Sequence, residues 1–86
     1  MAEYEVFFRR SVLKKDLAGV PRGDLKRIIE AIRSLAADPR PRGVQKLSGQ
    51  EYYRLRRGDY RIVFSIQDEV RSIWITKVGH RRDIYR

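Results

Sequence analysis

The chain has 86 residues and no cysteine, so we expect a single domain over residues 1–86 and exclude disulfide bonds and cysteine-based metal sites or nucleophiles. Twenty lysines and arginines against eleven aspartates and glutamates give a net charge of +9, which favours a polyanionic partner such as nucleic acid, a ribosome or an acidic protein. No apolar run approaches the roughly 18 residues of a membrane span, and the N-terminus lacks a signal-peptide pattern, so we expect a cytoplasmic protein without a membrane partner.

The first predicted elements are a strand and a short helix. Residues 4–8 alternate apolar side chains with others, as a half-buried strand does. Ser11 is a candidate N-cap for a short helix that ends at Gly19. The side chains of this helix that we expect to point inward are Val12, Leu13 and Leu17.

A longer helix is predicted to begin at Pro21 and to end at Asp38. Proline is favoured at the first helical position, where its missing N–H has no consequence. Asp38 precedes a proline, and such a residue disfavours helical backbone. One apolar stripe recurs at helical spacing and consists of Leu25, Ile28, Ile29, Ile32, Leu35 and Ala36.

Residues 40–50 predict a loop, because they have no periodicity and contain Pro41, Gly43 and Gly49. Leu47 is expected to anchor this loop. Lys46 is expected to stay near the basic face of the hairpin that follows.

Residues 52–64 predict a β-hairpin that turns at Gly58-Asp59. A Gly-X pair suits a two-residue type II′ turn, because glycine takes positive φ at the first central position without steric cost. This turn fixes the register of the two strands. The expected pairs are Arg57 with Tyr60, Arg56 with Arg61, Leu55 with Ile62, Arg54 with Val63, and Tyr53 with Phe64.

Directly opposed side chains share one face of a sheet, so the hairpin has an apolar face and a basic face. The apolar face carries Tyr53, Leu55, Ile62 and Phe64, with Arg57 and Tyr60 at the turn end. The basic face carries Arg54, Arg56, Arg61 and Val63. Opposed arginines destabilise a hairpin. The basic face therefore either meets an anion or is a solvated edge, and this stretch alone favours neither.

A third strand is predicted after a turn at Asp68-Glu69. The expected pairs are Gln67 with Val70, Ser65 with Ser72, Phe64 with Ile73, Val63 with Trp74, Ile62 with Ile75, and Arg61 with Thr76. This register places Ile73 and Ile75 in the core and Trp74 and Thr76 on the basic face.

The elements together predict an α+β fold in the order β-α-α-β-β-β. We expect a four-stranded, mostly antiparallel sheet with two N-terminal helices packed on one face. The first strand should pair beside residues 70–77, and the long helix should cover the apolar face. The arginine face then stays uncovered.

The C-terminal segment is expected to approach the basic face. Gly79 should bend the chain away from the sheet near the opposed arginines, and Arg81 and Tyr85 then reach the basic face from the side. In an alternative arrangement, Ile84 or Tyr85 simply docks the tail onto the sheet.

The sequence resembles the RelE/ParE toxin superfamily over essentially the whole chain. The similarity lies in the order of elements and in two motifs, Gly-Asp-Tyr-Arg-Ile-Val-Phe at residues 58–64 and Val-Gly-His-Arg-Arg-Asp-Ile-Tyr at residues 78–85. These motifs are closest to the RelE branch, whose members are mRNA-cleaving toxins of type II toxin–antitoxin pairs. The resemblance implies an endoribonuclease that acts on mRNA in the ribosomal A site and is neutralised by a cognate, acidic, RelB-like antitoxin.

The resemblance also implies a set of site residues. By position, the catalytic residues are Arg54, Arg56, Arg61, Arg81 and Tyr85. We expect further RNA contacts from Lys46, Arg57, His80 and Arg82. The best-known RelE type has lysines at the positions of Arg54 and Arg56. Arginine stays protonated at neutral pH and is therefore a poor base.

Family chemistry is attack of a ribose 2′-OH on the adjacent phosphate, which gives a cyclic phosphate and a free 5′-OH without a metal or other cofactor. Arg61 and Arg56 are expected to clamp the scissile phosphate, while Arg54 positions and helps to activate the 2′-OH. Arg81 would stabilise or protonate the leaving 5′-oxygen, and Tyr85 would stack on a base. The sequence contains no convincing metal cluster.

Several alternatives remain open at this point. The ParE branch shares the fold but inhibits DNA gyrase and cuts no RNA, and a passive nucleic-acid-binding module is also compatible with the charge. His80 is a further candidate acid or base and ranks below Arg81 in this role. Exposed Trp74, Val63 and Val70 are a candidate landing site for an antitoxin, unless the tail or a neighbouring side chain covers Trp74.

Overall fold

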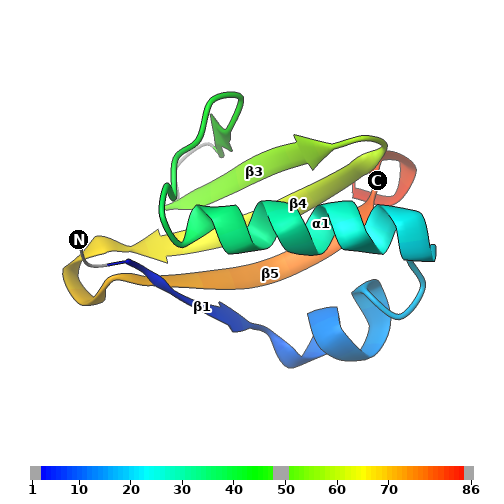
Figure 1. Cartoon of the computed structure of the whole chain (residues 1–86), viewed down its shortest axis with the longest axis horizontal. Coiled ribbons are helices and arrows are strands. Elements are labelled where there is room, and N and C mark those ends of the chain that lie inside the picture. The colour runs from blue at the N-terminus through cyan, green and yellow to red at the C-terminus, as the bar shows by residue number, and fades with distance from the viewer. Residues whose placement is uncertain (1–2, 48–50, 85–86) are drawn as a thin grey trace.

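The computed structural model of the chain describes residues 3–47 and 51–84 and has an α+β fold (Figure 1). Its strands are β1 (Glu5–Phe8), β2 (Gln45–Lys46), β3 (Tyr52–Arg57), β4 (Tyr60–Gln67) and β5 (Ser72–His80). Its helical segments are the π-helical turn η1 (Val12–Asp16), α1 (Arg22–Leu35), the 3₁₀ turn η2 (Asp68–Val70) and α2 (Arg81–Ile84). Within the described residues, no helix is both long and apolar enough to cross a membrane.

The strands form one five-stranded mixed sheet in the order β1-β5-β4-β3-β2. β1 runs parallel to β5 and pairs beside it at the expected edge, whereas the other neighbours are antiparallel. The predicted four-stranded sheet is wrong in one respect. Gln45 and Lys46, expected in a loop, form β2 and pair with Arg54 and Tyr53 of β3.

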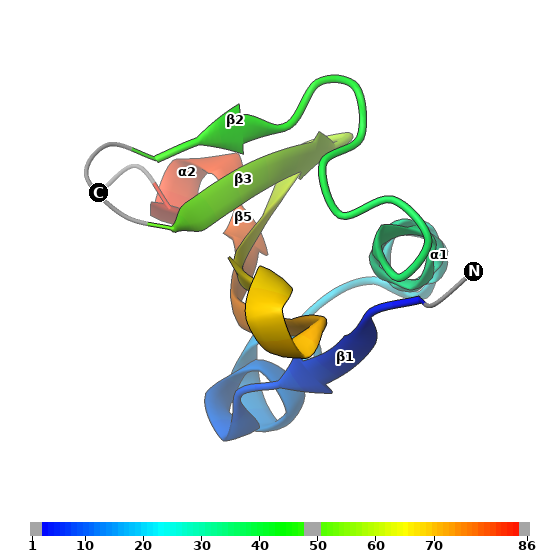
Figure 2. The same cartoon turned by 90° about the vertical axis from the view of Figure 1, so that its left-hand side faces the viewer.

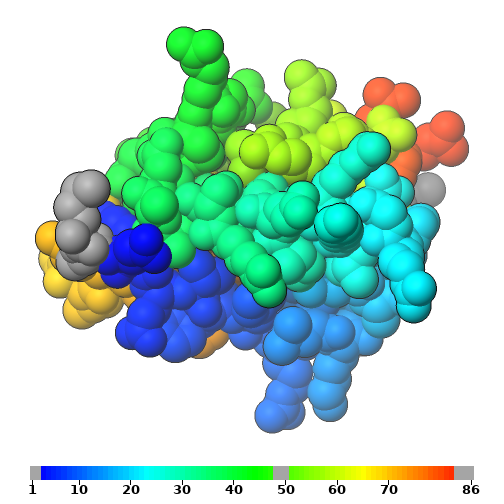
Figure 3. Space-filling model, in the orientation of Figure 1, coloured from blue at the N-terminus to red at the C-terminus, as the bar shows by residue number. Residues whose placement is uncertain are grey.

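Helix α1 covers one face of the sheet, and Figure 2 shows it to one side of the strands. Its predicted stripe is confirmed, because Ile28, Ile32 and Leu35 are at most 2% exposed. Each such side chain contributes about 1.5–3 kcal/mol by leaving water. Figure 3 shows this side of the molecule, where residues of the N-terminal half, coloured blue to green, form most of the surface.

The first helical segment differs from its prediction. Val12 is fully buried, but Leu13 is 55% exposed and the Ser11 side chain makes no capping hydrogen bond. Instead of packing as a second helix on the sheet face, η1 continues along the edge of β5 beyond the end of β1. There the backbone N–H of Val78 donates to Oδ2 of Asp16 at 2.9 Å. A side chain thus replaces the missing strand partner.

The β3–β4 hairpin confirms the predicted register at every pair from Arg57–Tyr60 to Tyr53–Phe64. Gly58 has φ of +57°, and Arg71 is the only non-glycine residue with positive φ in the described part of the chain. Positive φ at the first central position alone is the pattern of a type II′ turn. The two-residue turn therefore sets which side chains face the core.

The β4–β5 register differs from the prediction, because the connection has four residues and not two. Residues 68–70 form η2, and Arg71 follows with φ of +50°. Gln67 consequently pairs with Ser72, and Phe64 pairs with Ile75, two residues further along than predicted. An even shift preserves the face, so Ile73 and Ile75 are buried as expected.

A β-bulge changes the face of the last part of β5. Thr76 is the extra residue, because Phe64 pairs with Ile75 whereas Val63 pairs with Lys77. The shift of three residues beyond the bulge turns Val78 into the core, where it is 1% exposed. The predicted bend at Gly79 is wrong, since β5 continues through this residue to His80.

A polar cluster lies at the end of the sheet that is far from the hairpin turn. It joins the loop after α1 to β3, to the β4–β5 connection and to the residue before β1. Arg40 Nη2 and Nη1 donate to Asp68 Oδ2 and Oδ1 at 2.9 and 3.2 Å, and Arg40 Nε donates to the Tyr53 hydroxyl at 3.2 Å. The Tyr4 hydroxyl donates to Asp68 Oδ1 at 2.6 Å. The hydrogen bonds from Arg40 and Tyr4 hold the pKa of Asp68 below its ordinary value, and the bond from Arg40 has the larger effect.

Candidate active site

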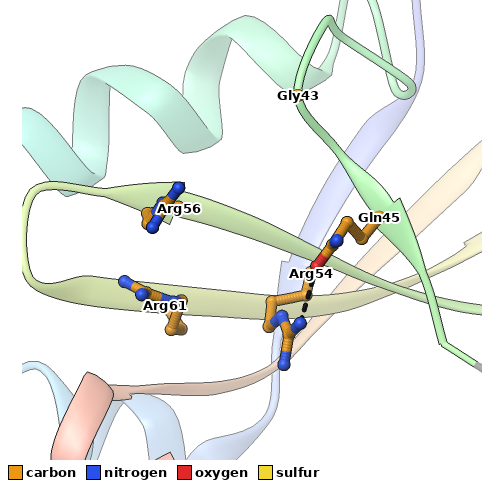
Figure 4. Close-up of a pocket in the computed structure, with 5 residues that line it drawn as sticks. All are labelled: Gly43, Gln45, Arg54, Arg56 and Arg61. Carbon is orange, nitrogen blue, oxygen red and sulfur yellow. Dashed lines mark hydrogen bonds between the residues drawn. The ribbon is translucent and has the colours of Figure 1, made fainter.

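A pocket of about 310 Å³ lies on the face of the sheet that α1 does not cover. Arg54 and Arg56 of β3 and Arg61 of β4 line it, together with Gln45 of β2 and Gly43 of the preceding loop (Figure 4). These three arginines alternate along their strands with side chains that are buried in the core. The alternation of the hairpin therefore builds the predicted basic face.

The three arginines differ in how firmly they are held. Arg61 is 5% exposed, and its Nη1 donates to the backbone carbonyl of Tyr60 at 3.2 Å. Arg54 is half-buried, and its Nη2 donates to Oε1 of Gln45 at 2.6 Å. Arg56 is exposed and lies directly opposite Arg61. The pocket thus combines two anchored guanidinium groups with one accessible to solvent.

The described residues that line this pocket are strongly basic. They comprise three arginines, a glutamine and a glycine, and none of these five carries a carboxylate or an imidazole. Guanidinium groups present several donors in a planar fork that matches phosphate oxygens. The arrangement can therefore bind and stabilise an anionic group, and it offers no side chain that is a strong base at neutral pH.

Two of the predicted RNA contacts from the hairpin region lie away from this pocket. Arg57 is on the opposite face of β3, and its Nη1 donates to the carbonyl of Arg56 at 2.9 Å. Lys46 pairs with Tyr53 on that same opposite face, and its Nζ lies 3.6 Å from Oε2 of Glu51. The basic face of the described structure therefore excludes both side chains.

Three of the C-terminal candidates, His80, Arg81 and Arg82, lie near the hairpin turn and are not among the described lining residues. His80 pairs with Tyr60 on the helix side of the sheet, where the two rings form an edge-to-face contact with centroids 5.4 Å apart. Arg81 begins α2, its N–H donates to the carbonyl of Asp59 at 2.7 Å, and its Nε lies 3.9 Å from Asp59 Oδ1. Arg82 is exposed, and its N–H donates to Nδ1 of His80 at 3.3 Å. Tyr85 falls outside the described residues.

Sequence reasoning missed two lining residues, Gly43 and Gln45. Both come from the segment that we expected to be an unpaired loop. Gln45 reaches the pocket because it pairs with Arg54, whereas the predicted contact, Lys46, points to the other face. A two-residue strand carries no periodic pattern, so only the proximity of residues 45 and 46 to the hairpin hinted at it.

The fold and the pocket define a small, basic α+β protein that presents a cluster of arginines on the sheet face opposite α1. The family model described as ParE toxin of the type II toxin–antitoxin system parDE matches residues 7–85. A protein named RelE1 from Methanocaldococcus jannaschii is 32% identical over 88 residues, covering 98% of this chain and 97% of that protein. Toxin RelG of Mycobacterium tuberculosis is 35% identical over 77 residues, covering 85% and 86%.

The same relationship holds for a solved structure. A chain of the archaeal RelE–RelB complex from Pyrococcus horikoshii OT3 matches with a TM-score of 0.78 and 30% identity, covering 91% of this chain and 94% of that one. The chain belongs to the RelE/ParE superfamily and is a toxin of the type II toxin–antitoxin class. The resemblance inferred from the two sequence motifs is confirmed.

Proposed function

We propose that this toxin is a ribosome-dependent mRNA endoribonuclease that cleaves by attack of the 2′-OH on the scissile phosphate. The observation that carries the proposal is the pocket of Arg54, Arg56 and Arg61, in which none of the described lining residues is acidic. The backbone phosphates of RNA are anionic groups of the kind that such a pocket attracts. The ribosome would present the mRNA and contribute to its alignment.

In the proposed reaction, the 2′-oxygen bonds to phosphorus while the bond from phosphorus to the 5′-oxygen breaks. The 2′-hydroxyl loses its proton and the leaving 5′-oxygen gains one, which gives a cyclic phosphate and a free 5′-OH. Negative charge develops on the phosphate oxygens as the transition state forms. Preorganised donors that meet this charge usually make the largest contribution to the rate.

Each arginine has a role that follows from how it is held. Arg61 is fixed by burial and, with Arg56 opposite, clamps the phosphate. Arg54, oriented by Gln45, positions the 2′-OH. Arg81 would stabilise or protonate the leaving 5′-oxygen, and Tyr85 would stack on a nucleobase. For this role the Arg81 side chain has to turn from Asp59 toward the substrate.

Among the described lining residues there is no acidic or imidazole side chain, and this limits how the pocket can activate the 2′-OH. Arginine holds its proton too firmly to act as an efficient base. We therefore attribute most of the rate to charge stabilisation and to alignment of the 2′-oxygen with the phosphorus, which together can lower the barrier strongly.

The partner proposed for this toxin is a cognate, acidic, RelB-like antitoxin in the cytoplasm. The net charge of +9 is complementary to such a protein. The support from relatives is the RelE–RelB complex, in which a chain of the same fold occurs with an antitoxin.

The decisive experiment compares Arg56→Ala with Arg57→Ala in a translating extract, with mRNA cleavage read by primer extension. The two arginines are neighbours on β3 and carry the same charge, but they lie on opposite faces of the sheet. Loss of one charge-stabilising donor reduces turnover by about 10²–10³-fold, which we expect for Arg56→Ala alone. Equal cleavage by both variants, with both folded, would overturn the assignment.

Inhibition of DNA gyrase is the second candidate function, because the family model that matches residues 7–85 is that of ParE toxins. A gyrase supercoiling assay with purified toxin distinguishes inhibition of gyrase from mRNA cleavage. Blocked supercoiling together with intact ribosome-bound mRNA would favour the ParE function. Salt-sensitive binding to RNA without either activity would indicate a passive nucleic-acid-binding module.

A further inference from the structure

An aromatic pair occupies the same open face as the arginine pocket. Phe7 of β1 pairs with Trp74 of β5, and their rings stack with centroids 5.0 Å apart and planes 21° apart. Both remain accessible, at 37% and 42% exposure. The next residues of the same cross-strand row are Ser65 of β4 and Tyr52 of β3. The prediction that Trp74 lies on this face is therefore correct.

The rows between this pair and the turn are basic. The next row toward the turn contains Lys77, Val63 and Arg54. It lies two residues away along β3 and β4, roughly 7 Å, and three residues away along β5 because of the bulge. Two residues further along β3 and β4 lie Arg61 and Arg56, which are displaced from the row of the pair by roughly 13 Å in the direction of the strands. A chain that carries negative charge can thus run from the arginine pocket to the aromatic pair past Lys77 and Arg54.

On its other side, the aromatic pair borders a row without cations. This row contains Glu5, Ser72 and Gln67. Gln67 Nε2 donates to Ser65 Oγ at 3.0 Å, and Ser72 Oγ donates to Gln67 Oε1 at 3.2 Å. The polar groups here bond to one another, and Glu5 repels phosphate. The positive track therefore ends at the aromatic pair.

We propose that Trp74 and Phe7 form a stacking platform for a nucleobase of single-stranded RNA, at the end of the strand that leaves the arginine pocket. Aromatic side chains beside a positively charged groove are how proteins hold single strands, since every base has a π-face. A base extends the existing stack of two near-parallel rings. This inference deepens the proposed function by adding a site that contacts the RNA away from the scissile phosphate.

The platform can be tested directly, because Trp74 is the only tryptophan of the chain. The full-length toxin is titrated with a single-stranded RNA oligonucleotide that is 2′-O-methylated throughout and so cannot be cleaved by 2′-OH attack. Stacking of a base on the indole is expected to quench the intrinsic fluorescence to a saturating level. The affinity is measured in parallel from the anisotropy of a labelled copy of the oligonucleotide.

Three variants isolate the role of the ring. Trp74→Ala is expected to weaken binding by about 5- to 150-fold, the range for loss of one base–aromatic stack. Trp74→Phe retains a ring and should bind within a few-fold of the wild type. Leu13→Ala removes another exposed apolar side chain, located in η1, and should leave the affinity unchanged.

Binding without quenching, or equal affinity of Trp74→Ala and the wild type, would overturn the platform. Quenching by a partner protein but not by RNA would overturn it as well and would make the pair a protein contact. The proposed cleavage fails separately. A toxin that binds the oligonucleotide with quenching but leaves ribosome-bound mRNA intact keeps the platform and loses the ribonuclease assignment.

Discussion

The turn at Gly58 sets the register that brings the arginines together, and its contribution to stability can be measured in isolation. Gly58 has φ of +57°, and a Cβ added there would meet no atom within 4 Å. Gly58→Ala therefore introduces no clash with neighbouring groups, only an unfavourable backbone conformation. Such strain costs about 1–3 kcal/mol. For a domain of this size, each kcal/mol lowers the melting temperature by roughly 4–8 °C.

Gly23→Ala is the matched control, because a Cβ at Gly23 also meets no atom within 4 Å but the residue lies in the first turn of α1. Alanine favours helix over glycine by up to about 1 kcal/mol, so this variant should be slightly more stable than the wild type. Thermal and urea unfolding followed by circular dichroism measure both variants. Equal stability of Gly58→Ala and the wild type would show that the turn does not hold the hairpin in this conformation.

Two further predictions concern charge. Asp68 has its pKa lowered in the fold by Arg40, so its contribution to stability is present above about pH 4 and is lost as the pH falls through the lower folded-state pKa. The difference in melting temperature between the wild type and Asp68→Asn should shrink as the pH falls below that value, and a constant difference would contradict this. Arg56→Glu creates an opposite-charge pair with Arg61 and should stabilise the fold by roughly 0.2–1 kcal/mol while abolishing cleavage. A lower melting temperature would contradict this reasoning.

The hairpin could be predicted completely because its turn residues and its alternation are both local in sequence. Gly58 allows a two-residue turn, and such a turn leaves one possible pairing of the flanking strands. The β4–β5 connection lacks such a signal. Arg71 takes positive φ without being glycine or asparagine, so nothing in the composition distinguishes a four-residue connection from a two-residue one.

The difference between the predicted and the observed β4–β5 register increases along β5 and changes the surroundings of one site candidate. Near the turn the register differs by two residues, which leaves the faces unchanged, but beyond the bulge at Thr76 it differs by three. As a result His80 lies beside Tyr60 on the helix side of the sheet, away from Arg61. Bulges depend on how a strand packs against its neighbours. A single sequence therefore does not locate them.

The core side of the hairpin explains how a site with such unfavourable charge persists. Arg56 and Arg61 repel each other across the strands, at a cost of up to about 1 kcal/mol. On the other face, Leu55 and Ile62 are at most 1% exposed and contribute about 1.5–3 kcal/mol each. A slip of one residue would exchange the two faces and place the arginines in the core. The same burial that holds the hairpin in register thus keeps the like charges together, where the anionic substrate that we propose would relieve their repulsion.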